Sequence, residues 1–372
     1  MQILGNRTLY RDGEYVSFPN LARFADGTVA CAFRHAKERQ KEYGRVTHVD
    51  PTAKDVFIVS RDGGRTFSSD YGVIIDDEMM SDQDPCLTVL RSGRIIATYF
   101  RWALKPAGQG EAAWGENFRR LGRTLFGKYD CLSDGFCYSI SDDNGKTWRQ
   151  MEVLHPDGFI RGTAVRGNIT ELPDGALLLP FYGTKRLGEL SRVGLMRSDD
   201  QGETFRTYSE AAWDPKNEKN YLEPNLYRTA SGRLVGLYRT QTDWNKPGAD
   251  FDDTYLNLHM SVSTDDGRTF GPVTEAKTLW GSSPFHALRL QSGNVLLSYG
   301  WRRPPFGIRA RICNPELTDI DEAPEIILRD DAPGGDLGYP CSIQLDDGTI
   351  MVSYYIPDAS GIRGIEATLL RE

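Results

Sequence analysis

The sequence has few residues of the kinds that form metal centres, and it has no long apolar segment. Its 372 residues include 5 histidines and 6 cysteines, without the paired spacing of metal ligands. No run of about 18 apolar residues occurs, so we expect no membrane span. The first residues lack the pattern of a secretion signal. We therefore expect a cytoplasmic protein with reduced thiols and no metal or other cofactor. A secreted or periplasmic chain trimmed of its signal would read the same.

Other absences narrow the function further. The net charge of −8 and the isoelectric point near 5.3 disfavour nucleic-acid binding. Neither a G-x-S-x-G elbow nor a phosphate-binding loop occurs. The hydrophobic content of 39% is enough for a large core.

One eight-residue pattern, S-x-D-x-G-x-T-aromatic, occurs four times. The copies are residues 60–67, 141–148, 198–205 and 263–270, and each follows a short β-like run. The aspartate can accept hydrogen bonds from turn amides, and the glycine tolerates a positive φ. The aromatic residue can anchor the returning strand in an apolar layer. Four copies indicate a repeat architecture.

A second repeat defines the fold. Six Asp-Gly or Ser-Gly hairpin signals precede β-like runs, with glycines at positions 27, 93, 175, 232, 293 and 348. This pattern predicts an all-β, six-bladed β-propeller with four antiparallel strands per blade, formed by residues 1–372 as a single domain. We expect an insertion at about 101–135 in blade two, and residues 8–10 as the missing outer strand of blade six.

The hairpins also locate the residues near the central axis. Nine residues before the six glycines stand Phe18, Asp84, Arg166, Glu223, Pro284 and Tyr339. His286 follows two residues after Pro284, on the same strand face. Arg34 and Arg239 stand seven residues after their glycines, where second strands return to the same end of the ring. We expect these polar groups to converge on one mouth that binds an anionic or polyhydroxylated ligand.

The sequence resembles the six-bladed sialidases. The four turns resemble that family's structural Asp boxes, and residues 223–239 and 339–355 resemble two of its catalytic hairpins. The resemblance implies that Tyr339 is the nucleophile, that Glu223 is its base and that Arg239 binds the substrate carboxylate. It also implies an aspartate acid in the loop 35–54, where Asp50 is the only aspartate. Asp84 is the alternative acid.

The sequence departs from the family at two of its three carboxylate-binding arginines. Ser17 precedes Phe18-Pro19 where the family has the first arginine. The third is expected from blade five, where Arg302, Arg303 and Arg309 are available, and we expect Arg303. Arg34 or Arg166 can compensate for the missing arginine, and we expect His286 and Asp84 beside the substrate.

These observations predict a sialidase-like exo-glycoside hydrolase that removes a terminal acidic sugar with retention. A tyrosine nucleophile is the exception among glycosidases. It suits an acidic sugar because a neutral phenol is not repelled by the substrate carboxylate. The expected partner is therefore an acidic oligosaccharide or glycoside, with no nucleic acid and no membrane. Two alternatives remain: a non-catalytic glycan-binding propeller, and a lyase acting on uronate-containing glycans with Tyr339 or His286 as base.

Overall fold

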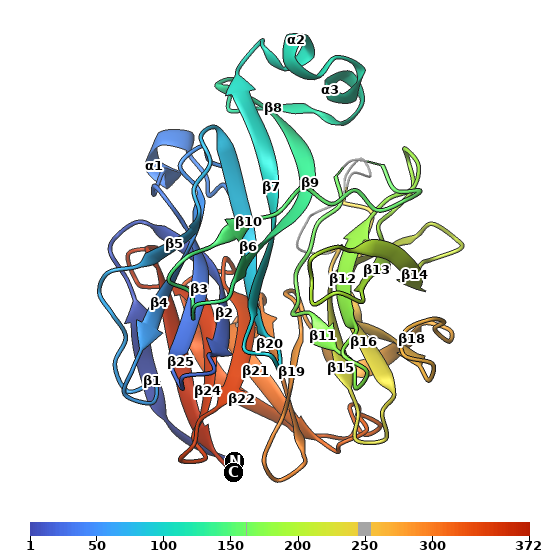
Figure 1. The fold of residues 1–372 in the computed structure, drawn as a ribbon. Coiled ribbons are helices and arrows are strands. Elements are labelled where there is room, and N and C mark those ends of the chain that lie inside the picture. Colours follow the sequence, from blue (N-terminus) through green and yellow to red (C-terminus); the bar gives the residue numbers. More distant parts are fainter. Residues whose placement is uncertain (161, 245–253) are drawn as a thin grey trace.

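The computed structural model describes residues 1–160, 162–244 and 254–372, and it confirms the six-bladed propeller. Six antiparallel sheets surround a central axis, each with its first strand innermost (Figure 1). The six hairpin glycines all have positive φ, from 81° to 94°, which accounts for glycine at these turns. The predicted glycine turns therefore join the first and second strands of every blade.

The first three blades share one strand order, from the axis outward. Blade one contains β2 (Tyr15–Arg23), β3 (Val29–Ala36), β4 (Lys54–Ser60) and β5 (Gly72–Ile75). Blade two contains β6 (Met80–Val89), β7 (Ile95–Pro106), β9 (Tyr129–Ser141) and β10 (Arg149–Gln150), with β8 (Arg123–Leu125) added beside β9. Blade three contains β11 (Thr170–Glu171), β12 (Leu177–Gly183), β13 (Arg192–Ser198) and β14 (Arg206–Ala212).

The last three blades complete the ring. Blade four contains β15 (Lys219–Arg228), β16 (Leu234–Thr242), β17 (Asn257–Ser263) and β18 (Thr274–Trp280). Blade five contains β19 (His286–Arg289), β20 (Val295–Trp301), β21 (Phe306–Cys313) and β22 (Glu325–Ala332). Blade six contains β23 (Gly338–Gln344), β24 (Ile350–Pro357), β25 (Arg363–Arg371) and, outermost, β1 (Gln2–Tyr10).

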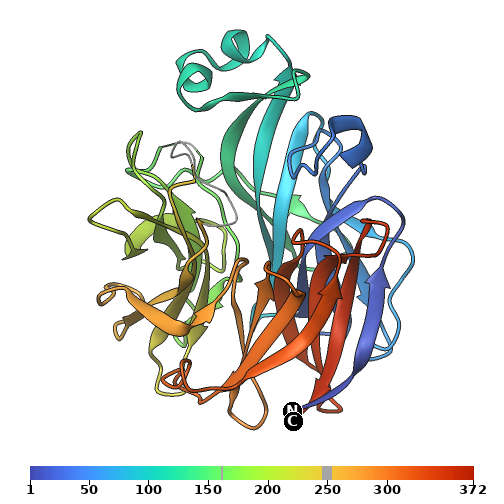
Figure 2. The same ribbon diagram turned by 180° about the vertical axis from the view of Figure 1, so that it is seen from behind.

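Strand β1 closes the ring. It pairs antiparallel with β25, with Gln2 opposite Arg371, so both ends of the chain lie together at one edge of blade six (Figures 1 and 2). The predicted closing strand is therefore confirmed, and it begins earlier than residue 8.

The four Asp boxes form identical networks between the third and fourth strands of their blades. In the first, the Ser60 hydroxyl donates to Asp62 at 2.7 Å and accepts from the Gly64 amide at 2.9 Å. The amide and the hydroxyl of Thr66 both donate to Asp62. The other three boxes repeat these bonds. The aspartate therefore organises each turn.

Each box also joins its blade to the preceding one. Trp148 of blade two packs against the apolar cluster shared by blades one and two. Phe67, Phe205 and Phe270 pack against the clusters between their own blades and the blades before them. The aromatic position of the repeat is thus an inter-blade anchor, and the boxes lie at the end of the ring opposite the strand ends that enclose the candidate site.

Four innermost strands carry the same β-bulge at an X-Pro dipeptide. The residues before proline have left-handed backbone angles: Phe18 (φ 59°), Asp84 (57°), Glu223 (45°) and Tyr339 (54°). Each X-Pro pair faces a single residue of the second strand, and these opposing residues are the fully buried aromatics Phe33, Tyr99, Tyr238 and Tyr354. A left-handed conformation costs a non-glycine residue roughly 1–2 kcal/mol. Such strain concentrates at functional sites.

Blade two rises above the ring. Strands β7 and β9 extend past the other blades and carry α2 (Gly110–Trp114), α3 (Glu116–Leu121) and β8 (Figure 1). Gly115, whose φ is 55°, separates α2 from α3. A shorter helix, α1 (Gln40–Tyr43), lies in the blade-one loop, and Tyr43 stacks on Phe126 at 4.2 Å between ring centroids. No helix in the described part of the chain is long and apolar enough to cross a membrane.

Candidate active site

The bulges surround a pocket of about 330 Å³ at the centre of the ring. Phe18, Asp84, Glu223 and Tyr339 all line it, so four of the six residues expected at this axial level reach the cavity. Second strands add Phe100, Trp102, Tyr182 and Arg239, and the loops add His48, Trp244 and Arg302. This combination of aromatic surface and a few convergent polar groups is typical of a ligand site.

Tyr339 and Glu223 meet inside this pocket. The Tyr339 hydroxyl donates a hydrogen bond to Oε1 of Glu223, although the two residues belong to blades six and four. Nη1 of Arg239 donates to both carboxylate oxygens of Glu223, at 2.9 and 2.8 Å, and lies 3.3 Å from the Tyr339 hydroxyl. All three side chains are buried. The arginine therefore fixes the position of the carboxylate beside the phenol.

The environment keeps Tyr339 protonated. Burial raises the pKa of this phenol well above its usual value, and the negative charges of Glu223 and Asp84 act in the same direction. The guanidinium groups of Arg239 and Arg302 act in the opposite direction. A phenol of this kind needs a base in contact with it before it can act as a nucleophile. Glu223 is in that position.

Asp84 presents a second carboxyl group to the pocket. It makes no hydrogen bond to any residue that the structure describes, and it is 3% exposed. Burial raises its pKa to about 7, with Arg166 lowering it and Glu223 raising it. A carboxyl group with this pKa is partly protonated near neutral pH, which is the property required of a general acid.

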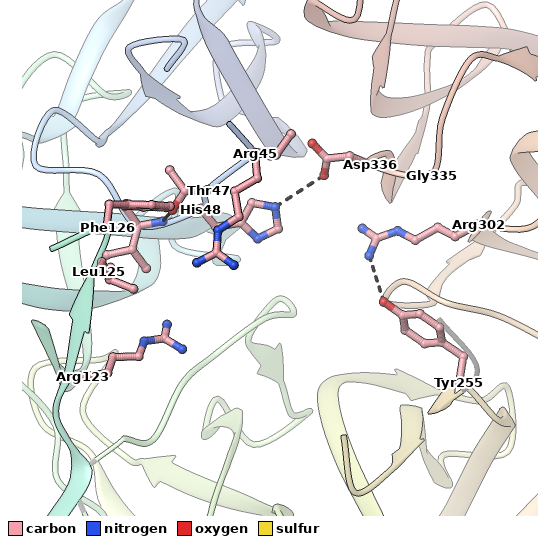
Figure 3. A pocket seen from close by; sticks show the side chains of 12 residues that line it. Arg45, Thr47, His48, Arg123, Leu125, Phe126, Tyr255, Arg302, Gly335 and Asp336 are labelled. Carbon is pink, nitrogen blue, oxygen red and sulfur yellow. Dashed lines mark hydrogen bonds and ion pairs between the residues drawn. The ribbon is translucent and has the colours of Figure 1, made fainter. Parts of the chain in front are cut away.

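Arg302 forms the rim between this pocket and a second, outer pocket of about 500 Å³. Its nitrogens donate to the hydroxyls of Tyr255 and Tyr355, at 3.3 and 3.1 Å, and to the Leu337 carbonyl at 3.0 Å. Figure 3 shows its guanidinium group pointing into the outer pocket. His48, Val49 and Arg123 also line both pockets, which makes the two cavities adjoining parts of one site.

Three predicted residues lie outside both pockets. Arg166 is buried and donates to the main-chain carbonyls of Phe18, Pro19 and Tyr339, so it supports two of the bulges. His286 contacts Cys341 at 3.6 Å and accepts from the Ser342 amide. Burial lowers its pKa to about 4. The His286 side chain thus packs against β23 of blade six and lines neither pocket.

Arg34 is also buried outside the pockets, opposite Asp55 on the neighbouring strand. None of the side-chain nitrogens of Arg34 and neither carboxylate oxygen of Asp55 has a hydrogen-bond partner among the described residues. Burial, together with the charges of Asp82 and Asp84, raises the pKa of Asp55 well above its usual value. Arg34, Arg166 and His286, which we expected beside a substrate, therefore line neither of the two pockets.

Asp50 and Arg303, the expected acid and the expected third arginine, also lie outside both pockets. The Asp50 carboxylate is buried, accepts from the Thr52 amide at 2.9 Å and lies 3.0 Å from Nε of Arg39, and it lines neither pocket. Asp84, the alternative acid, does line the inner pocket. Arg303 is exposed and stacks over Trp280 at 3.9 Å, whereas the adjacent Arg302 faces the site.

Two further features of the sequence mark the positions of the bulges. A proline follows each of Phe18, Asp84, Glu223 and Tyr339, and this repeated X-Pro step marks the bulges. An aromatic residue stands six positions after each hairpin glycine and opposes the bulge where one is present. His48 and Arg45 come from a loop without periodicity, and Arg123 begins the short strand β8 of the insertion, so no comparable signal exists for them.

Comparison with known proteins places this architecture in a family. The model of the BNR repeat-like domain matches residues 124–352. A protein of unknown function from Dyadobacter fermentans DSM 18053 is 31% identical, with a TM-score of 0.86 and coverage of 100% of this chain and 98% of that chain. No match was found among curated proteins.

More distant structures share the fold. The NanB sialidase from Streptococcus pneumoniae is 14% identical with a TM-score of 0.64, and the match covers 100% of this chain and 70% of that one. An α-L-arabinofuranosidase from Fusarium graminearum is 12% identical with a TM-score of 0.64, covering 100% and 98%. Since the family model spans more than half of the sequence, this chain belongs to the BNR repeat-like domain family, and it has the six-bladed fold of the sialidase superfamily.

Proposed function

We propose that this protein is a retaining exo-glycoside hydrolase that removes a terminal acidic sugar. The observation that carries the proposal is the hydrogen bond between the Tyr339 phenol and the Glu223 carboxylate inside the central pocket. A buried phenol that donates to a carboxylate has the arrangement of an activated nucleophile. The sialidase and arabinofuranosidase that share the fold support a glycosidase reaction.

In the first step, the Tyr339 oxygen attacks the anomeric carbon and its proton passes to Glu223. Arg239 stabilises the negative charge that develops on the phenol oxygen, because its Nη1 lies 3.3 Å from that atom. Asp84 gives its proton to the leaving oxygen as the glycosidic bond breaks. The product of this step is a sugar covalently attached to Tyr339.

In the second step, the ionised Asp84 removes a proton from water, which attacks the anomeric carbon from the face that the leaving group has vacated. The tyrosine oxygen departs and recovers its proton from Glu223. Asp84 thus changes from acid to base between the steps, and two displacements at one carbon retain its configuration.

An acidic sugar suits this site for two reasons. A neutral phenol approaches a substrate carboxylate without the repulsion that an aspartate or glutamate nucleophile would meet. Arg302 faces the site with hydrogen bonds only to neutral oxygens among the described residues, so its charge is available to a substrate carboxylate. Arg239 is already engaged by Glu223. We therefore expect Arg302 to provide the main contact to the substrate carboxylate, rather than three arginines together.

The test is a panel of 4-methylumbelliferyl glycosides of sialic, glucuronic and galacturonic acids, with an α-L-arabinofuranoside as the uncharged member. We expect release of fluorophore from an acidic glycoside, and early NMR spectra that show the released sugar in the configuration of the substrate. Inversion would contradict the double displacement. An unsaturated product that absorbs ultraviolet light would indicate a lyase, and binding without any product would indicate a non-catalytic propeller.

A further inference from the structure

The outer pocket gathers positive charge beside the proposed catalytic pocket. Arg45, Arg123 and Arg302 all line it, and Figure 3 shows their guanidinium groups around one cavity. Arg45 comes from the loop between β3 and β4 in blade one, and Arg123 comes from β8 of the blade-two extension. Arg302 comes from the loop between β20 and β21 in blade five. Three separate segments therefore supply cations to one volume of about 500 Å³.

Arg45 and Arg123 have no carboxylate partner among the residues that the structure describes. Arg45 lies over the Phe126 ring at 5.0 Å, and Arg123 lies over the Trp102 ring at 4.5 Å. Neither forms an ion pair with any residue in the described ranges. By contrast, the surface residue Arg94 forms ion pairs with Asp142 and Glu203.

Asp336 is the one carboxylate among the described residues that line the outer pocket, and other groups already engage it. It accepts from the hydroxyls of Tyr15 and Tyr355 at 3.0 and 2.9 Å, and from Nε of Arg363 at 2.9 Å. His48 lies 3.4 Å from its Oδ1. Although burial raises the pKa of Asp336, the hydrogen bond with His48 and the charges of Arg363 and Arg302 hold it well below its usual range. Asp336 forms no ion pair with Arg45 or Arg123 among the described residues, so these two charges remain available to a ligand.

Three guanidinium groups around one cavity repel each other unless an anion lies between them. Aromatic stacking fixes Arg45 and Arg123 in place before any ligand arrives, which lowers the ordering cost of binding. Guanidinium groups match the planar oxygens of carboxylates and the oxygens of sulfate. The cavity is thus prepared for an oxyanion.

We propose that the outer pocket binds a carboxylate or sulfate group on the sugar unit next to the one that is cleaved. The two cavities share Arg123, Arg302 and His48, so a ligand in the inner pocket continues directly into the outer one. This inference rests on the proposed function for its orientation, and it narrows the substrate class to oligosaccharides with charge on two adjacent units.

A sugar-independent test uses selenate, which replaces sulfate and gives an anomalous X-ray signal. Crystals of the full chain soaked in selenate should show a peak between Arg45 and Arg123, and the R45Q/R123Q variant should lack it. The matched control is R119Q/R120Q, which removes the same charge from exposed arginines of α3 that pair with Glu111 and Glu116. No peak in the outer pocket, or a peak that persists in R45Q/R123Q, would overturn the proposal.

A binding experiment distinguishes a carboxylate from a sulfate group as the anion that the outer pocket binds. Calorimetry with the Y339F variant compares tetragalacturonate with its methyl ester, and chondroitin 4-sulfate tetrasaccharide with its desulfated form. We expect one charged member to bind at least about tenfold more tightly than its partner, and the difference to disappear in Y339F/R45Q/R123Q. Equal binding within both pairs would contradict the proposal. If no tetrasaccharide binds, the selenate result decides.

Neither experiment depends on turnover. Anion binding in the outer pocket without hydrolysis of any glycoside would contradict the proposed function and leave the anion site in place. Hydrolysis of an acidic glycoside without charge-dependent binding in the outer pocket would support the proposed function and contradict the anion site.

Discussion

Tyr339 and Glu223 are joined by a hydrogen bond across the centre of the ring, although 116 positions separate them in the sequence. Both stand at the first position of an X-Pro bulge, with positive φ. The bulge turns the side chain out of the strand ladder toward the axis. Equivalent distortions in different blades thus bring a phenol and a carboxylate together.

Tyr339→Phe should remove turnover and leave the fold intact. The substitution deletes only the oxygen that attacks the anomeric carbon, and we expect kcat/KM to fall at least about 100-fold on the best acidic glycoside. Circular dichroism and the thermal midpoint serve as the controls for folding. Full activity in a well-folded Y339F protein would rule out the tyrosine mechanism.

Arg239→Met should destabilise the protein more than Glu223→Gln. Removing the arginine leaves a buried carboxylate without its counter-charge, which typically costs about 3–5 kcal/mol. The E223Q substitution removes one counter-charge of Arg239, but it keeps the shape of the side chain and an oxygen that accepts from Arg239, and Asp84 also interacts with this guanidinium group. Urea unfolding at pH 7 measures both. If E223Q unfolds at a lower urea concentration than R239M, Arg239 is not the counter-charge that stabilises the buried Glu223 carboxylate.

Activity should fall as the pH rises through about 7. Burial raises the pKa of Asp84 to about 7, and the proposed first step needs its protonated form, so activity is present below this pH and lost above it. Asp84→Asn should lower the rate about 100-fold or more and abolish this alkaline limb. Asp82→Asn is the control, because Asp82 has a pKa raised to about 8 by burial but lines neither pocket. A limb near pH 7 that survives in D84N would exclude Asp84 as the acid.

Arg302→Gln and Arg303→Gln form a matched pair of adjacent substitutions. Arg302 lines both pockets, whereas Arg303 is exposed over Trp280. We expect R302Q to raise KM for an acidic glycoside at least about tenfold, and R303Q to change it less than twofold. The opposite result would restore the assignment expected from sequence.

Asp265→Asn should destabilise the fourth Asp box without affecting catalysis. Hydrogen bonds from Thr269 and Ser263 lower the pKa of Asp265 to about 2. Because the folded pKa is depressed, the stabilisation is present above the unfolded pKa of about 4 and is lost as the pH falls through about 2. The urea midpoint of D265N should therefore lie below that of the unmodified protein at pH 7 and approach it at pH 3.

The neighbouring Asp266→Asn is the control for that experiment. Asp266 makes no hydrogen bond to a described residue, and asparagine tolerates its φ of 54°. Equal effects of the two substitutions would mean that the box network contributes nothing to stability.

The sequence was informative wherever the structure is set by local turns. The hairpin glycines and the box aspartates act within a few residues of themselves, so their spacing predicted the blades. Counting from those glycines placed Asp84, Glu223, Arg239 and Tyr339 in the pocket.

Residues in irregular segments were not predictable in this way. Asp50 lies in a loop where no periodicity sets the direction of a side chain, while His48, two residues earlier, faces the cavity. Arg302 and Arg303 differ by one position and therefore point to different sides of the chain end. Arg34 and Arg166 have the residue type expected of a ligand-binding group, but only the packing of neighbouring blades shows that they are enclosed.

The pairing of β1 with β25 has a consequence for how this protein is made. During synthesis, residues 2–10 emerge long before their partner strand, Arg363–Arg371, has been translated. Contacts between such distant segments form slowly. Strand β1 is therefore an unpaired edge until β25 has been made, and the ring closes only when these two segments meet.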